Sequence, residues 1–158
     1  MGRGYDFKCK QCGHSYGNRL GIGGIFTRFY QQYANEILSG AWGEKWKDRL
    51  SSLEYAAIDI HNKLYLCKSC HNWTEEPSLA IYVPNDQATI DKSHLIDGTS
   101  NVLWAVIPDW NYHFLASYVH KCSKCGKRMR HIEVNPQTEL SCPKCGHENP
   151  ALGTIMWD

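Results

Sequence analysis

The chain has 158 residues, enough for one domain of ordinary size or two small ones. Its hydrophobic fraction of 42% supports a core, its formal charge is only +1, and no apolar run approaches the ~20 residues that a membrane-spanning helix needs. Residues 1–6 lack the apolar stretch of a secretory signal, so we expect a cytoplasmic protein and no membrane partner.

The N-terminal third predicts a cysteine-bearing turn followed by two helices. Residues 7–13 (FKCKQCG) are typical of a strand that runs into a metal-binding knuckle, with Gly13 at a position where a positive φ is useful. Residues 17–24 are rich in glycine and predict a loop. Apolar residues then recur at helical spacing, so we expect a helical insertion at about 22–53.

The middle of the chain changes to the alternation that is typical of strands. Residues 58–60 and 64–66 predict a hairpin whose second arm delivers Cys67 and Cys70, and residues 78–83 are a further strand candidate. Residues 85–101 are polar and aperiodic. We interpret them as a linker or long loop between an N-terminal zinc-knuckle domain, residues 1–84, and a C-terminal β/zinc-ribbon domain, residues 102–158.

The C-terminal part alternates short strands with cysteine pairs. Strands are predicted at 102–107 and 112–119, and a hairpin is predicted from 132–134 and 139–141 around the turn at 135–136. The hairpin lies between the pair Cys122/Cys125 and the pair Cys142/Cys145. The predicted fold class is therefore α+β, with small antiparallel β ribbons built on two four-cysteine zinc sites and a helical insertion in the first.

All cysteines of the chain fall in four Cys-x-x-Cys pairs. In a reducing compartment such pairs are more often metal ligands than disulfides, and two pairs complete one tetrahedral sulfur cage. We therefore predict two closed sites holding two Zn²⁺ per chain, with the ligands Cys9, Cys12, Cys67, Cys70, Cys122, Cys125, Cys142 and Cys145. Since each Zn(Cys)₄ cage carries a charge of −2, loading both sites would change the formal charge from +1 to −3.

The pairing of the four knuckles is a hypothesis at this point. Cys125 and Cys142 are separated by a spacing within the usual ~15–20 residues of a four-cysteine site, which favours joining the third knuckle to the fourth. The first site would then join Cys9/Cys12 to Cys67/Cys70 across the helical insertion. An arrangement in which the first knuckle meets the third stays open, as does a single knuckle without a partner.

The two C-terminal knuckles, Cys122-Ser-Lys-Cys125-Gly126 and Cys142-Pro-Lys-Cys145-Gly146, resemble those of the zinc-ribbon family. The resemblance covers roughly residues 120–150 and implies a structural metal without implying a particular activity. The knuckles also resemble those of rubredoxin, which holds iron with the same ligands, so iron is the alternative metal. The whole chain loosely resembles uncharacterised small bacterial zinc-ribbon proteins.

The sequence favours a role other than catalysis without deciding it. Four sulfurs per metal leave no open position, whereas a catalytic zinc usually keeps one for water. The histidines show no paired ligand motif, and residues 17–24 match neither a Walker loop nor a dinucleotide fingerprint.

Three functions are compatible with these patterns. The principal hypothesis is a non-enzymatic zinc-binding module that scaffolds a protein–protein interaction, in which Trp42 and Trp46, if exposed, would anchor the partner. The second is a nucleic-acid-binding ribbon that uses the basic cluster of residues 121–130, namely Lys121, Lys124, Lys127, Arg128 and Arg130. Those cations could equally serve to stabilise a negative metal cage. The third is a redox- or metal-responsive protein with a labile Cys-x-x-Cys site.

Overall fold

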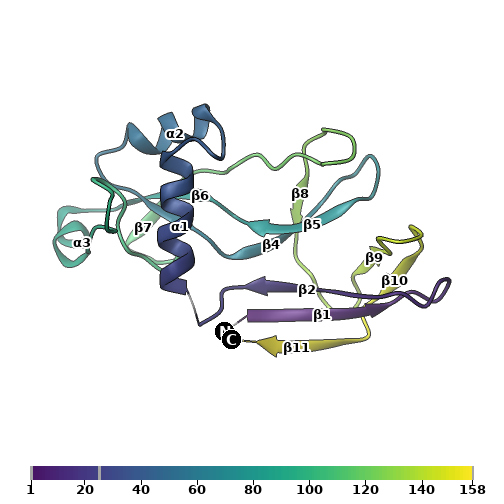
Figure 1. Cartoon of the computed structure of the whole chain (residues 1–158). Coiled ribbons are helices and arrows are strands. Elements are labelled where there is room, and N and C mark those ends of the chain that lie inside the picture. The colour runs from purple at the N-terminus through teal and green to yellow at the C-terminus, as the bar shows by residue number, and fades with distance from the viewer. Residues whose placement is uncertain (1, 25, 158) are drawn as a thin grey trace. The chain divides into compact units, whose positions relative to one another are not determined.

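A computed structural model describes residues 2–24 and 26–157 (Figure 1). The chain forms two compact units, each assembled from separate segments: unit 1 from Met1–Gly24, His61–Pro77 and Val119–Asp158, and unit 2 from Ile25–Ile60 and Ser78–Tyr118. The predicted linker, 85–101, lies inside unit 2, so the structure divides the chain differently from the predicted boundary. The predicted α+β class is confirmed, since the described residues form three helices and mostly antiparallel strands.

Unit 1 contains a six-stranded sheet and a separate two-stranded one. The larger sheet has the order β11-β1-β2-β4-β5, with β8 also paired to β4, and all of its pairings are antiparallel. Its strands are β1 (Gly2–Lys8), β2 (Ser15–Gly21), β4 (Asn62–Leu66), β5 (Trp73–Pro77), β8 (Arg130–Ile132) and β11 (Gly153–Trp157). The smaller sheet pairs β9 (Glu139–Ser141) with β10 (Glu148–Pro150). Figure 1 shows β11, β1 and β2 side by side.

Glycines allow β1 and β2 to approach each other closely. A Cβ atom on Gly4 would lie 2.5 Å from the carbonyl oxygen of Asn18, and one on Gly17 would lie 2.7 Å from Oδ1 of Asp6. Glycine inside a strand often marks such an approach. The prediction of a loop at 17–24 was therefore wrong for residues 17–21, because these glycines serve the contact between two strands rather than a turn.

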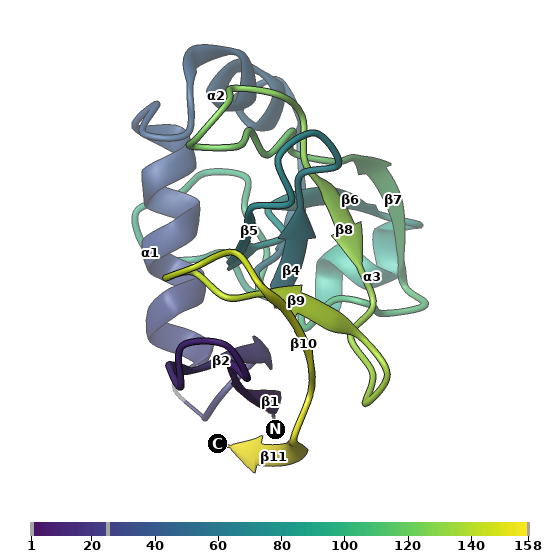
Figure 2. The ribbon, with the colours of Figure 1, turned by 90° about the vertical axis from the view of Figure 1, so that its right-hand side faces the viewer.

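Unit 2 packs helices with a three-stranded antiparallel sheet of order β3-β6-β7. Its elements are α1 (Phe26–Leu38), α2 (Glu44–Ser51), β3 (Ala57–Asp59), β6 (Ala80–Pro84), α3 (Gln87–Lys92) and β7 (Tyr112–Ala116). The two predicted helices are confirmed, although α1 begins later than 22. Figure 2 shows α1 along its length, with α2 following at its end. Among the described helices, none is long and apolar enough to cross a membrane.

The buried face of α1 follows from its helical spacing. Tyr30, Ala34 and Ile37 are fully buried, and they recur at intervals of four and three residues. The Tyr30 hydroxyl donates a hydrogen bond to the Leu103 carbonyl (2.8 Å) and accepts one from the Ile58 amide (3.1 Å). This hydroxyl therefore ties the helix to backbone groups on two other segments of unit 2.

Two predicted hairpins and one predicted strand were wrong. Residues 58–60 and 64–66 do not form a hairpin, because β3 pairs with β6 in unit 2 whereas β4 belongs to the sheet of unit 1. Residues 132–134 and 139–141 do not pair either, because β8 joins β4 and β9 joins β10. Residues 102–107 form only isolated bridges, at Val102 and Leu103. Alternation along the chain identifies a strand but carries no information about its partner.

Candidate metal centres

The eight cysteines gather into two groups of four, both within unit 1. Centre A consists of Cys9, Cys12, Cys142 and Cys145, and centre B of Cys67, Cys70, Cys122 and Cys125. In each centre the Sγ atoms all lie within 4.8 Å of one another, so that they can hold a metal ion. The hypothesised pairing of first with second and third with fourth was wrong, and so was the open alternative of first with third: the first knuckle meets the fourth, and the second meets the third.

Strand pairing explains this nested arrangement. β1 leads directly into Cys9 and pairs with β11, which follows the fourth knuckle, so the ends of the chain close centre A. β4 leads directly into Cys67, and its Leu66 lies opposite Arg130 of β8, just beyond the third knuckle. The spacing between Cys125 and Cys142 suited a local site, but β8 and β9 occupy that segment and pair elsewhere.

The distances between sulfur atoms fit metal coordination. In centre A the Sγ atoms of Cys9 and Cys145 are 3.4 Å apart, and in centre B those of Cys70 and Cys122 are 3.5 Å apart. A disulfide would require about 2.05 Å, whereas the edge of a sulfur tetrahedron with metal–sulfur bonds of about 2.3 Å is about 3.8 Å. All eight cysteines are free thiols. The donor set therefore suits a tetrahedral thiophilic metal.

The four knuckles share one backbone turn. In each, the amide following the second cysteine donates to the carbonyl of the first cysteine at 2.8–2.9 Å. The residue that supplies this amide has a positive φ in every case: Gly13 (71°), His71 (57°), Gly126 (70°) and Gly146 (79°). Glycine adopts this conformation without steric cost, as predicted for Gly13, whereas a residue with a Cβ atom pays about 1–2 kcal/mol for it. His71 is the exception among the four knuckles.

The electrostatics of each centre favour partial ionisation of the thiols. Burial by itself raises the pKa of Cys9, but hydrogen bonds from the Cys12 backbone and the Cys145 thiol lower it to about 6. Backbone hydrogen bonding from His147 lowers the pKa of Cys145, but burial and the neighbouring Cys9 and Cys12 raise it to about 12. Four clustered sulfurs cannot all become anionic without a cation among them, so a metal ion would displace protons from these thiols as it binds.

A bridge of hydrogen bonds connects the residues beside the two centres. The Ser141 hydroxyl donates to the His71 carbonyl (2.9 Å), and the Trp73 indole N–H donates to the Ser141 carbonyl (2.8 Å). His71 follows Cys70 of centre B and Ser141 precedes Cys142 of centre A, so the bridge joins the two centres through residues adjacent to their ligands. Sequence reasoning missed this bridge, although a histidine where the other three knuckles have glycine was a visible signal.

A pocket of about 310 Å³ lies beside the bridge. Cys70 of centre B, Cys142 and Cys145 of centre A, and the two lysines Lys124 and Lys144 are among the residues that line it. Lys124 belongs to the predicted nucleic-acid-binding set, and all members of that set, Lys121, Lys124, Lys127, Arg128 and Arg130, are exposed. Lys121 and Arg128 face each other across the third knuckle in an isolated antiparallel bridge.

The tryptophans that were predicted to anchor a partner are packed within unit 2. Trp42 and Trp46 are half-buried, and their rings contact Tyr118 edge to face at centroid distances of 5.5 and 5.6 Å. Their indole N–H groups donate to Glu36 (3.0 Å) and to the carbonyl of Leu79 (3.2 Å). In contrast, Trp110 is 95% exposed. Strands were predicted on either side of residues 108–111, but the exposure of Trp110 between them was not.

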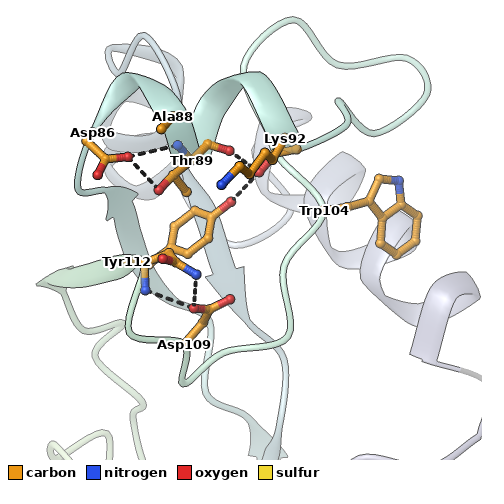
Figure 3. A pocket seen from close by; sticks show the side chains of 9 residues that line it. Asp86, Ala88, Thr89, Lys92, Trp104, Asp109 and Tyr112 are labelled. Atoms are coloured by element: carbon orange, nitrogen blue, oxygen red, sulfur yellow. Dashed lines mark hydrogen bonds between the residues drawn. The ribbon is translucent and has the colours of Figure 1, made fainter.

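A second pocket, of about 210 Å³, lies in unit 2 between α3 and the turn at 108–111 (Figure 3). Asp86 caps α3 by accepting hydrogen bonds from the amide and hydroxyl of Thr89, both at 2.8 Å. From the opposite wall, the Tyr112 hydroxyl reaches that of Ser93 at 2.9 Å. Figure 3 shows Asp86 and Asp109 on opposite walls of this polar pocket.

Comparison of the chain with protein-family models, curated proteins and solved structures found no match. The interpretation of function therefore rests on the geometry of the two centres and on the surfaces of the two units.

Proposed function

We propose that this protein is a non-enzymatic zinc-binding module that scaffolds a protein–protein interaction. The observation that carries the proposal is the position of the cysteines: both four-sulfur centres lie in unit 1, and unit 2 contains none of the eight cysteines. Centres with four protein ligands act as structural clamps, since they leave no position for a substrate. Zinc is the proposed ion because such closed thiolate sites are typical of structural zinc, and iron is the alternative with the same ligand geometry.

The apolar surface of unit 2 supports a protein partner. Large hydrophobic side chains with substantial exposure in unit 2 are Phe29, Leu95, Val106, Trp110 and Phe114. Aromatic residues are enriched in the cores of protein interfaces, and tryptophan is prominent among the residues that dominate binding energy. Trp110 thus replaces Trp42 and Trp46 as the proposed anchor.

Metal analysis and affinity capture test this proposal together. We expect about two zinc ions per chain in protein purified without added metal, and no thiol that reacts until a chelator is added. The metal-loaded protein should then retain a partner from its host lysate after nuclease treatment, and a Trp110→Ala variant should lose it. Iron with a visible thiolate absorption band, or capture that Trp110→Ala leaves unchanged, would contradict the proposal.

Nucleic-acid binding is the second candidate, and the exposure of all five cations at 121–130 favours it. Unit 1 has 12 lysines and arginines against 7 acids, a formal charge of +5. Two loaded centres would reduce this charge to about +1, since each cage contributes −2. This candidate predicts capture that nuclease abolishes and that falls steeply with salt.

Redox or metal-responsive chemistry is the third candidate. The exposure of Cys70, Cys125 and Cys145 favours it, since accessible thiolates are the ones that oxidants reach. In the same metal analysis, release of zinc by mild peroxide would move this candidate ahead of the scaffold, and retention would exclude it.

A further inference from the structure

Unit 2 displays Trp110 on a turn that hydrogen bonds hold in place. The Asn85 side chain donates to the Trp110 carbonyl (2.6 Å), and the Asn85 amide donates to the carbonyl of Asn111 (2.9 Å). Within the turn, Oδ1 of Asp109 accepts from both the amide and the side chain of Asn111, at 2.8 and 3.0 Å. A surface that is ordered before its partner arrives loses little conformational entropy on binding.

The charge around this turn is negative. Unit 2 has 9 acids against 5 lysines and arginines, a formal charge of −4, in contrast to the basic unit 1. In the segment 78–118, four of the five charged residues are aspartates, and Lys92 is the fifth. Asp109 directly precedes Trp110, and Asp86 directly follows Asn85, whose side chain holds the turn. Hydrogen bonds from Thr89 lower the pKa of Asp86, so this carboxylate is ionised at neutral pH.

An exposed indole that directly follows an aspartate in the chain suits a cationic side chain. An arginine or lysine over the face of a tryptophan gains a cation–π attraction, and arginine can also form paired hydrogen bonds to a carboxylate. Nucleic acid is disfavoured here despite the aromatic ring, because a unit with a charge of −4 repels phosphates. The surface therefore differs in chemistry from the basic cluster at 121–130.

We propose that the Trp110 turn, residues 108–111, together with Asp86, binds an arginine- or lysine-bearing segment of a partner protein. This inference rests on the proposed scaffolding function and adds the chemistry of the partner. The indole of Trp110 covers the cationic side chain, the carboxylate of Asp109 pairs with its charge, and the polar pocket between α3 and the turn receives the flanking backbone.

Nuclear magnetic resonance of the full metal-loaded chain tests this with a tetra-arginine peptide as the probe. We expect the Trp110 indole resonance, assigned by its absence in Trp110→Ala, and the amides of 108–111 to shift saturably. The dissociation constant should rise at least tenfold in Trp110→Ala and about fivefold in Asp109→Asn, which keeps an oxygen acceptor for Asn111. The matched control is Met156→Ala in β11 of unit 1, which removes a side chain that is 60% exposed and should leave the affinity unchanged.

Four outcomes would overturn the proposal. They are shifts confined to the cysteine knuckles, equal binding of a tetra-glutamate or neutral oligosaccharide probe, an affinity that Trp110→Ala does not change, and concentration-dependent shifts without a probe, which would identify a second copy of the chain as the occupant. An unchanged spectrum outside the turn shows that each variant is folded. If the peptide fails while lysate capture still depends on Trp110, the scaffolding function stands and only the basic chemistry of the partner is wrong.

Discussion

At the residue scale, Gly4 tests how closely the strands of unit 1 must approach. Gly4→Ala places a Cβ atom 2.5 Å from the Asn18 carbonyl oxygen and 2.8 Å from Cγ1 of Ile155. Because the first of these atoms is backbone in the neighbouring strand, the strands must separate, and overpacking of this kind costs about 1–3 kcal/mol of unfolding free energy. Denaturant unfolding of the metal-loaded protein measures the loss. Gly153→Ala in β11 is the control, since its Cβ meets nothing within 4 Å, and an equal loss in both variants would refute the explanation.

Residues whose role is set within a single turn of the chain could be predicted from the sequence. The Cys-x-x-Cys spacing indicated metal ligands, and the glycine after Cys12 indicated a positive φ, because both requirements are met within one turn. The role of Gly17 could not be predicted, because its constraint is the backbone of Tyr5 in another strand. The exposure of Trp110, in contrast to Trp42, likewise depends on what the rest of unit 2 covers.

At the element scale, the start of β5 and the end of β9 couple the two metal centres. The hydroxyl of Ser141 bonds the carbonyl of His71, and the indole of Trp73 bonds the carbonyl of Ser141. A metal in either centre fixes one side of this bridge and so favours the other centre. We expect Ser141→Ala with Trp73→Phe to weaken this coupling, because two hydrogen bonds of about 1 kcal/mol each can contribute up to about thirtyfold in metal affinity.

A double-mutant cycle measures the coupling. Centre A is disabled with Cys9→Ser and Cys12→Ser, and the cobalt affinity of centre B is determined with and without the bridge. Loss of centre A should weaken centre B in the native background and should weaken it less once the bridge is absent, where the His71–Glu148 contact of 3.2 Å remains. An effect of the same size in both backgrounds would show that the bridge does not carry the coupling.

The sequence predicted which of these segments form helices or strands, but it did not predict which strands pair with each other. The periodicity of α1 and α2 is visible along the chain, because a helix satisfies its hydrogen bonds within itself. β3 and β4 were equally visible as strands, but the chain passes from one unit to the other between Ile60 and His61. Their partners, β6 and β5, were therefore set by the burial of each unit rather than by proximity in sequence.

At the scale of the whole molecule, every candidate metal ligand lies in unit 1, so removal of metal should act on the two units unequally. The binding energy of such a site is largely folding energy, and β1 and β4 of unit 1 run directly into Cys9 and Cys67 of the two centres. Unit 2 has its own buried cluster, which includes Leu103, Ile107 and Tyr112, and the buried face of α1. We therefore expect a chelator to unfold unit 1 while unit 2 keeps its tertiary structure.

Hydrogen exchange can follow the unfolding of unit 1 and the persistence of unit 2 separately, because protection is measured amide by amide. In chelator, amides of β1 and β4 should exchange at rates close to those of an unfolded chain, while those of α1 and β6 remain protected. Unfolding of 61–77 leaves a loop of modest length between β3 and β6, and the entropic cost of loop closure grows only slowly with length, by about 0.6 kcal/mol for each doubling. The antiparallel pairing of β3 with β6 should therefore persist. Uniform loss of protection would instead mean that unit 2 cannot fold without the metal-bound unit, and readdition of zinc would then have to restore both together.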